Sequence, residues 1–213
     1  PIDISEILTE SSEQLLKDYD TLHITGIIDT YEGGLEFLKS YDDKKNLILF
    51  LGSSFGNFTP DDGKLFLEKI FFTMKSDDLF LIGLDLVKDK NILESAYDDS
   101  QGVTAKFNLN VLSRINDELD ADFDINNFSH YSIYNENAQR IEMNLKSLVS
   151  QSVILGKSNL SLNLDKGELI HTEYSHKYCV SQIKKLLSDV GFEFKNMWLD
   201  DEKHFSLTLV SKN

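Results

Sequence analysis

The fold is decided by residues 46–87, which read NLILFLGSSFGNFTPDDGKLFLEKIFFTMKSDDLFLIGLDLV. Two apolar runs, Leu47–Leu51 and Leu79–Leu86, flank a segment whose apolar residues recur at helical spacing. Short continuous apolar runs of this kind are typical of strands buried on both faces. The helix begins after Thr59, where a capping hydroxyl, a proline and two acidic residues follow one another, and it runs to about Met74. A strand–helix–strand unit indicates a mostly parallel sheet covered by helices on both faces.

The same alternation continues toward both ends of the chain. The elements predicted on the N-terminal side are a strand at Ile2–Ile4, a helix at Ser5–Tyr19, a strand at Leu22–Ile28 and a short helix around Leu35–Tyr41. Near the C-terminus, Gly191 stops a helical stripe, and a short turn joins two apolar runs, Phe192–Leu199 and Phe205–Val210. Strands joined by so short a turn are antiparallel, which places them at the edge of the sheet.

The pattern changes over residues 88–176. A long helix is predicted over Ile92–Leu119. Predicted strands follow near Tyr131–Tyr134, Arg140–Val149, Ser152–Leu155 and Leu169–Ser175. We therefore expect an α/β core formed by residues 1–87 and 177–213, with an α+β insertion at 88–176.

The composition limits the classes of function. The 213 residues include 21 Lys and Arg but 36 Asp and Glu, which gives a net charge of −15. So acidic a surface repels phosphates and anionic lipids, which argues against a nucleic-acid or membrane partner. The single cysteine, Cys179, allows no internal disulfide, and this favours a reducing, cytoplasmic location. The five histidines show no metal-ligand spacing, so we expect no metal site and treat Cys179 as structural.

Candidate ligand-binding groups follow the predicted strands, since open parallel sheets bind ligands beyond the carboxyl ends of their strands. Asp3 follows the first strand, Asp29 and Thr30 the second, the Gly52–Asn57 loop the third, and Asp85 the fourth. Acids in such positions can accept hydrogen bonds from ribose hydroxyls or an adenine amino group, and the glycines let backbone approach a ligand. Each signal alone has another interpretation, because Asp3 could cap the next helix and Gly52 could serve only a tight turn.

Longer segments make the interpretation specific. The segments are LFLGSSFGNFTPDD (49–62), GLDLVKD (83–89), AYDDSQGVTAKFNLNVLSRINDEL (96–119), ADFD (121–124), RIEM (140–143) and HTEYSHKY (171–178). Taken in this order, they resemble the S-adenosylmethionine-dependent histidine N-alpha-methyltransferases, the family that makes trimethylhistidine (hercynine) for ergothioneine. The resemblance covers nearly the whole chain. It implies a Rossmann-like class I methyltransferase sheet with a substrate-binding α+β insertion, S-adenosylmethionine as cofactor, and a small amino acid, histidine, as substrate.

The resemblance also implies roles for individual residues. Those that would hold the cofactor are Asp3 at the ribose, Asp29 and Thr30 at the adenine, and Gly52 beside the methyl donor. Those that would line the substrate pocket are Asn57, Tyr97, Thr104, Phe107, Met143, Glu173, Tyr174 and Ser175. Within the second group, Asn57 and Tyr97 would hold the main-chain groups of histidine and act in catalysis. Glu173 and Ser175 would bind the imidazole.

The chemistry of these side chains suits such a reaction. A sulfonium methyl group is already electrophilic, so catalysis consists mostly of holding a neutral amine in line with the methyl–sulfur bond, an effect that reaches roughly 7–11 kcal/mol. The Asn57 amide can donate to a carboxylate and accept from an amine. Glu173 beside an imidazole selects the donor tautomer or the imidazolium, and Ser175 can serve the other ring nitrogen. Buried polar partners reject phenylalanine or leucine, which would leave them unpaired.

Ordinary structural roles stay open for four of these residues. Asn57 could cap the helix that starts near Thr59, and Glu173 could lie on a solvated strand face. Tyr97 could be interface packing, and Met143 could be a gap filler.

The chain departs from the family pattern at its start. The family begins its sheet with a strand and a glycine-rich cofactor loop ahead of the strand that ends at Asp3, and N-terminal helices complete its histidine pocket. Because the sequence starts at Pro1, we expect a processed or truncated chain whose exposed strand edges favour self-association, whereas the parent would be a monomer. Two other functions stay open, namely methyl transfer to another amino acid such as a tryptophan derivative, and a non-catalytic binding or assembly module.

Overall fold

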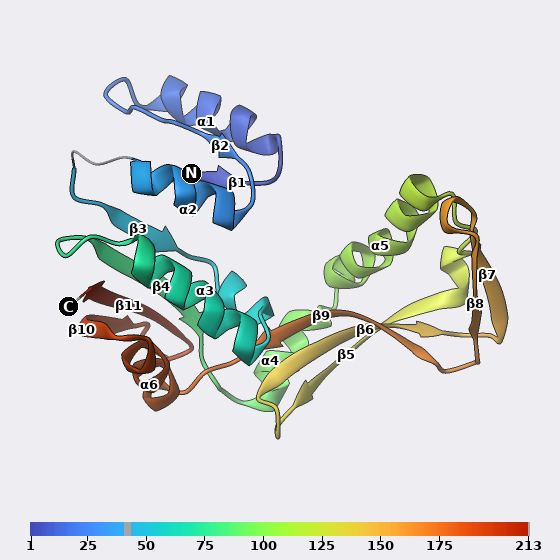
Figure 1. Cartoon of the computed structure of the whole chain (residues 1–213). Coiled ribbons are helices and arrows are strands. Elements are labelled where there is room, and N and C mark those ends of the chain that lie inside the picture. The colour runs from blue at the N-terminus through green and yellow to red at the C-terminus, as the bar shows by residue number, and fades with distance from the viewer. Residues whose placement is uncertain (41–43, 213) are drawn as a thin grey trace.

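The structure is a computed structural model that describes residues 1–40 and 44–212 (Figure 1). Its main body contains, in chain order, β1 (Ile2–Asp3), α1 (Ile7–Asp18), β2 (Ile27–Ile28), α2 (Tyr31–Ser40), β3 (Leu47–Phe50), the short 3-10 helix η1 (Ser54–Asn57), α3 (Pro60–Thr73) and β4 (Leu79–Asp85). After an insertion, it is completed by α6 (Val180–Val190), β10 (Phe192–Leu199) and β11 (Phe205–Lys212). This order confirms the predicted α/β class. Tyr41, the predicted end of the helix observed as α2, lies outside the described residues.

The predicted strand–helix–strand unit is confirmed. β3 and β4 pair in parallel, with Leu47 opposite Leu79. α3 starts where expected because the Thr59 side chain accepts a hydrogen bond from the backbone N–H of Asp62. β11 pairs antiparallel with β4, and β10 pairs antiparallel with β11. The sheet order is therefore β10-β11-β4-β3, with the last two strands of the chain at the predicted antiparallel edge.

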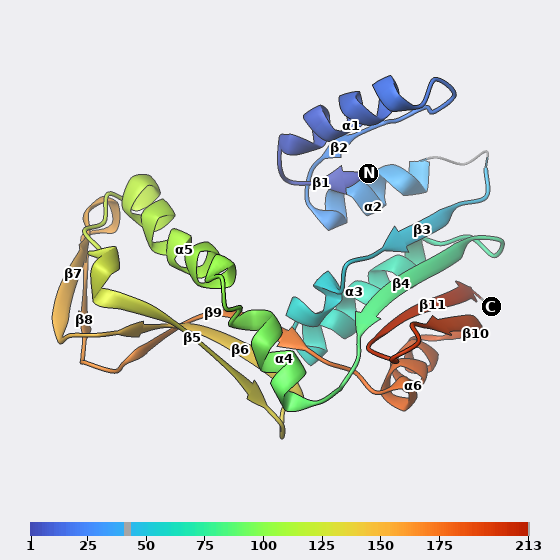
Figure 2. The ribbon, with the colours of Figure 1, turned by 180° about the vertical axis from the view of Figure 1, so that it is seen from behind.

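The hydrophobic core lies between this sheet and the helices α3 and α6. Its deeply buried members include Leu67 and Ile70 on α3, Phe80, Ile82 and Leu84 on β4, and Ile183 and Leu187 on α6. The prediction of helices on both faces is wrong for the four-stranded sheet. Figure 2 shows no helix over its second face in the described part of the chain, because α3 and α6 both pack on the other face.

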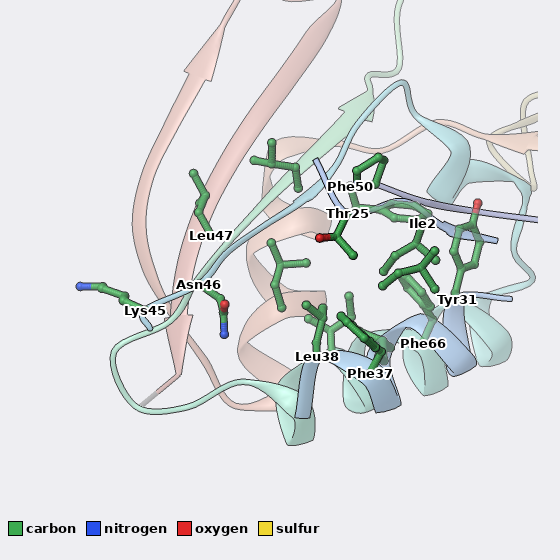
Figure 3. A pocket seen from close by; sticks show the side chains of 16 residues that line it. Ile2, Thr25, Tyr31, Phe37, Leu38, Lys45, Asn46, Leu47, Phe50 and Phe66 are labelled. Atoms are coloured by element: carbon green, nitrogen blue, oxygen red, sulfur yellow. The ribbon is translucent and has the colours of Figure 1, made fainter. Parts of the chain in front are cut away.

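A gap separates β3 from the two-stranded parallel sheet β1-β2. Both ribbon views show β1 and β3 running in the same direction (Figures 1 and 2). The gap holds a cavity of about 750 Å³ whose lining is mainly apolar and includes Ile2, Leu47, Leu49, Phe50 and Phe66 (Figure 3). Among the described residues no strand fills it, and Leu47 and Leu49 are more than half exposed. The strand predicted at Leu22–Ile28 shortens to β2 because β1 offers it only two residues to pair with.

The insertion extends away from the carboxyl ends of β3 and β4 (Figure 1). Its elements are α4 (Lys90–Tyr97), α5 (Val103–Leu119), η2 (Ile125–Asn127), β5 (Phe128–Asn135), β6 (Arg140–Ser147), β7 (Gln151–Leu155), η3 (Gly156–Ser158), β8 (Leu160–Leu164) and β9 (Leu169–His176). β5, β6 and β9 form an antiparallel sheet, and β7 and β8 form a hairpin. None of the helices in the described residues is both long and apolar enough to cross a membrane.

One prediction within the insertion is wrong, and one observed strand has no counterpart among the predicted ones. The single helix expected over Ile92–Leu119 is broken before Gly102, whose φ of 67° suits a residue without a side chain. The Asp99 carboxylate then accepts the backbone N–H groups of Val103 and Thr104, at 3.0 and 2.8 Å, and so starts a second helix. The observed strand without a predicted counterpart is β8, whose sequence LSLNL has the apolar–polar alternation of a strand over only five residues.

Candidate active site

The carboxyl ends of β3 and β4 meet the end of β9, and this junction lies at the predicted site. Gly52 and Ser53 follow β3 with left-handed backbone, at φ of 78° and 64°, and turn the chain into η1. The Ser53 hydroxyl accepts a hydrogen bond of 2.9 Å from the backbone N–H of Asp85 at the end of β4. The Nδ1 atom of His176 lies 2.9 Å from the Gly56 carbonyl oxygen, so this nitrogen donates its proton. The insertion is therefore bonded directly to the loop that follows β3.

Asn57 is the last residue of η1. Thr59, and not Asn57, caps α3. The Asn57 side chain is exposed and makes no hydrogen bond with other described residues. Its amide is therefore available to a ligand at the junction.

A buried polar cluster joins α4 to the end of β9. The Tyr97 hydroxyl lies 2.8 Å from Ser175 Oγ, and Lys177 Nζ lies 2.9 Å from each of these oxygens. The Lys177 side chain is fully buried, and its charge is paired with Oδ2 of Asp85 at 2.9 Å. Lys88 Nζ binds the other oxygen of Asp85 at 2.6 Å. A buried ammonium needs such partners, so the cluster fixes where the two hydroxyls lie.

Glu173 shares a sheet face with Ser175, because alternate residues of a strand point to the same side. Met143 on β6 is opposite Glu173 in the register and packs beside Tyr97 in a small buried cluster. Burial raises the pKa of Glu173, while the charges of Lys177 and His171 lower it. Glu173 is half-buried, which differs from a fully solvated strand face. A carboxylate partly removed from water is well suited to accept an N–H from a ligand.

His130 holds the backbone at Tyr97. Its Nε2 lies 2.7 Å from the Tyr97 carbonyl oxygen and must donate to it. Its Nδ1 therefore accepts from the side-chain amide of Asn108, at 2.9 Å, and the ring is the neutral Nε2–H tautomer. The same amide donates to the Asn144 carbonyl oxygen at 3.0 Å. These bonds tie α4, α5 and β6 together behind the cluster.

The remaining predicted substrate residues differ in their positions. Thr104 and Phe107 lie in the first turns of α5, and the Phe107 side chain is 66% exposed. The backbone N–H groups of Thr104 and Val103 donate to the Asp99 carboxylate and lower its pKa to about 2. Tyr174 points to the opposite sheet face from Ser175, where the Arg140 guanidinium lies 3.6 Å from its ring centre. The structure therefore does not bring the Tyr174 ring to the cluster.

The predicted cofactor acids lie together on the other side of the gap. The Asp29 backbone N–H donates to the Asp3 carbonyl oxygen at 3.1 Å, so the two strand ends are adjacent. One carboxylate oxygen of Asp3 accepts the Ser5 N–H at 2.8 Å, and one of Asp29 accepts the Thr30 N–H at 2.7 Å. Both residues are exposed, and within the described chain no hydrogen bond uses their second oxygens. Two neighbouring acceptors of this kind fit ribose hydroxyls and an adenine amino group, with Thr30 beside them.

The structure thus gathers the predicted residues into two groups. The first group lies on elements that contact one another and consists of Asn57, Tyr97, Glu173 and Ser175. Gly52 lies just before η1, the element that carries Asn57. The second group consists of Asp3, Asp29 and Thr30. None of the predicted site residues lines the apolar cavity between β1 and β3. In residues 1–40 and 44–212 no three His, Cys, Asp or Glu side chains are placed to hold a metal ion.

Sequence reasoning missed Lys177 and His130. Lys177 follows Ser175 by two residues, so strand alternation alone could have placed it on the same side. His130 carries no such signal, because its partner Tyr97 lies 33 residues away along the chain.

Comparisons with known proteins identify the family to which the sequence is similar. A family model described as "Histidine-specific methyltransferase, SAM-dependent" matches residues 1–212. The histidine N-alpha-methyltransferase of Mycobacterium tuberculosis is 36% identical over 213 residues, which is 100% of this chain and 66% of that protein. That of Mycolicibacterium smegmatis is 34% identical over 211 residues, covering 99% of this chain and 65% of its own length. The L-tryptophan methyltransferase of Psilocybe serbica is 26% identical over 195 residues, covering 88% and 54% respectively. The chain therefore spans about two thirds of the length of the two bacterial relatives.

Proposed function

The chain belongs to the S-adenosylmethionine-dependent, histidine-specific methyltransferase family, and we propose from this that the protein transfers methyl groups from S-adenosylmethionine to the α-amino group of histidine. The observation that carries the proposal is the junction of η1, α4 and β9, where the Asn57 amide and the Tyr97–Ser175 hydroxyl pair come from elements bonded to one another. Successive transfer of three methyl groups, giving trimethylhistidine, is part of the proposal. The single cysteine supports a cytoplasmic location for it.

The cofactor would be held by the acids at the ends of β1 and β2. Asp3 would accept from the ribose hydroxyls, and Asp29 with Thr30 would accept from the adenine amino group. The left-handed turn at Gly52 lets backbone approach the methyl donor without a side chain in the way. When bound, S-adenosylmethionine supplies a methyl group on a positively charged sulfur. The residues of the chain then have to hold the substrate amine in line with the methyl–sulfur bond.

The residues of the insertion would hold histidine at its two ends. Asn57 donates to the substrate carboxylate and accepts from its amine, and Tyr97 supports the same end from α4. Glu173 accepts the N–H of the imidazole, and Ser175 serves the second ring nitrogen. Burial of Lys177 keeps water away from its bonds to Tyr97 and Ser175 and so strengthens them.

The gap between β1 and β3 supports one further part of the proposal. Two parallel strand edges face an apolar cavity of about 750 Å³ (Figure 3), and one added parallel strand would pair with both of them. We place there the strand that the family resemblance puts before the Asp3 strand. Its glycine-rich loop would then reach the site between Asp3 and Gly52. Activity is therefore a property we assign to the full-length protein.

The test is to incubate the full-length protein with S-adenosylmethionine and an equimolar mixture of amino acids, and to follow each by mass spectrometry. We expect histidine to gain up to three methyl groups and the other amino acids to remain unmodified. If tryptophan were methylated in place of histidine, the proposed substrate would be wrong and the proposed reaction type would stand. Absence of any methylated amino acid, together with normal binding of S-adenosylhomocysteine, would overturn the proposal.

A further inference from the structure

Lys177 has all three hydrogens of its ammonium group in use. Its Nζ lies 2.9 Å from each of three acceptors, Oδ2 of Asp85, the hydroxyl of Tyr97 and Oγ of Ser175. An ammonium group has three donors and no acceptor. The side chain is fully buried, so water does not compete for these positions.

These contacts determine the direction of the hydrogen bonds around it. Both hydroxyl oxygens must accept from Lys177, because an ammonium cannot accept. The 2.8 Å contact between Tyr97 and Ser175 then uses the hydrogen of one hydroxyl. The hydrogen of the other hydroxyl has no acceptor among the described residues. Whichever hydroxyl it is, the pair presents one O–H donor to a ligand.

We propose that Lys177 is a positioning residue that makes the Tyr97–Ser175 pair a hydrogen-bond donor and thereby selects a substrate ring with an unprotonated nitrogen. This inference rests on the proposed function and names what the site recognises. Glu173, on the same face as Ser175, accepts the N–H of the ring on its other side. One donor and one acceptor together match a neutral imidazole.

A purely structural role for Lys177 makes a different prediction. Its pair with Asp85 also joins the insertion to β4, so loss of that bond alone would weaken the binding of every substrate alike. The chain offers a matched control in Lys88, which binds the same carboxylate at 2.6 Å and touches neither hydroxyl. Lys88→Met removes an ion pair to Asp85 and leaves the Tyr97–Ser175 pair as it is.

The first experiment uses the unaltered full-length protein. Binding is measured by calorimetry for β-(thiazol-4-yl)alanine, whose ring nitrogen accepts a hydrogen bond, and for β-(3-thienyl)alanine, in which a C–H replaces that nitrogen and the ring keeps nearly the same shape. We expect the thiazolyl compound to bind about tenfold more tightly, the value of one hydrogen bond in a water-excluded site. Equal affinities would overturn the inference without any variant that must fold.

The second experiment compares Lys177→Met with Lys88→Met for histidine and for the thienyl compound. We expect Lys177→Met to weaken histidine binding about tenfold and the thienyl compound by less than about threefold, and Lys88→Met to change both by less than about threefold. Equal losses for both ligands in Lys177→Met would show a structural role and overturn the inference. If the unaltered protein bound histidine no better than the thienyl compound, the proposed function itself would fail, which is a separate result.

Discussion

Replacing Glu173 by glutamine tests the imidazole assignment most directly, because the change removes the charge and keeps the size of the side chain. Glu173 is half-buried and shares a face with Ser175. In the proposed complex its carboxylate accepts the ring N–H of histidine. A glutamine can accept the same bond only as a neutral group, so the charge assistance is lost.

The size of the effect follows from these surroundings. A hydrogen bond to a charged group contributes about 1.5–3 kcal/mol, which corresponds to about 10- to 150-fold in Kd. Because glutamine keeps a weaker form of the bond, we expect Glu173→Gln to raise the histidine Kd about 10-fold, and Glu173→Ala to raise it by more. Affinity for S-adenosylhomocysteine should stay unchanged, since Asp3 and Asp29 lie across the gap.

The pH dependence gives a second readout. Burial raises the pKa of Glu173 above its usual 4.5, so the folded protein holds this proton more tightly than the unfolded chain does. The associated stability is present below pH 4.5 and is lost as the pH rises through the folded pKa. Histidine needs the ionised carboxylate, so its affinity should rise over the same interval. Glu173→Gln should lose the change in stability, and the pH dependence of its histidine affinity should follow only the titration of the substrate's own imidazole.

The assay is calorimetry of L-histidine binding to the full-length protein saturated with S-adenosylhomocysteine, repeated across pH, with urea unfolding of each variant. Glu136→Gln is the control, because Glu136 lies in the same insertion with a side chain that is 68% exposed. An unchanged histidine Kd in Glu173→Gln would refute the assignment. Equal losses of histidine and S-adenosylhomocysteine affinity would also refute it, by showing a general effect on the fold.

The other predictions concern the cofactor group and the core. Asp29→Ala should weaken S-adenosylhomocysteine binding about tenfold by calorimetry while unfolding as the wild type does in urea; an unchanged Kd would contradict the adenine assignment. Thr59→Ala should cost about 1 kcal/mol of unfolding free energy through loss of the α3 cap, measured as a lower urea midpoint at constant slope. Gly191→Ala should cost about 1–2 kcal/mol, because φ is 109° there, and no loss would dispute the left-handed cap of α6. Leu67→Ala should cost about 2–5 kcal/mol, whereas Phe72→Ala, at a residue 72% exposed, should stay within about 0.5 kcal/mol.

The elements that sequence analysis predicted correctly are those with local signals. The start of α3 is encoded by Thr59 and the residues that follow it, and β3 and β4 are continuous apolar runs. The stop of α6 at Gly191 is equally local. The failures depend on distant parts of the chain. β2 is short because it pairs with only two residues of β1, and one face of the sheet is open because α3 and α6 pack on the same face.

The residues of the candidate site divide in the same way, into those that the sequence could predict and those that depend on contacts with distant parts of the chain. Resemblance supplied Tyr97, Glu173 and Ser175, and the structure places them near one another. Strand alternation alone places Tyr174 on the opposite face from Glu173 and Ser175, but only the structure shows that α4 packs on the face of Glu173 and Ser175. The buried charge of Lys177 was also missed, because a lysine in a sequence is expected at the surface until its acceptors are known.

The junction between the body and the insertion explains how two distant groups of residues could serve one reaction. The chain leaves the sheet after β4 and returns before α6, and the two crossing points are bonded to each other. The Tyr178 N–H donates to the Asp85 carbonyl oxygen at 3.0 Å, and the Val87 N–H donates to the Tyr178 carbonyl oxygen at 3.1 Å. Lys177, the residue before Tyr178, also forms an ion pair with the Asp85 carboxylate. Methyl transfer by alignment alone tolerates little displacement of the amine, since a misplacement of about 1 Å can cost about 100-fold in rate. Pinning the insertion at both crossings fixes its distance from the strand ends, and this is the property that the proposed substrate-binding role of the insertion requires.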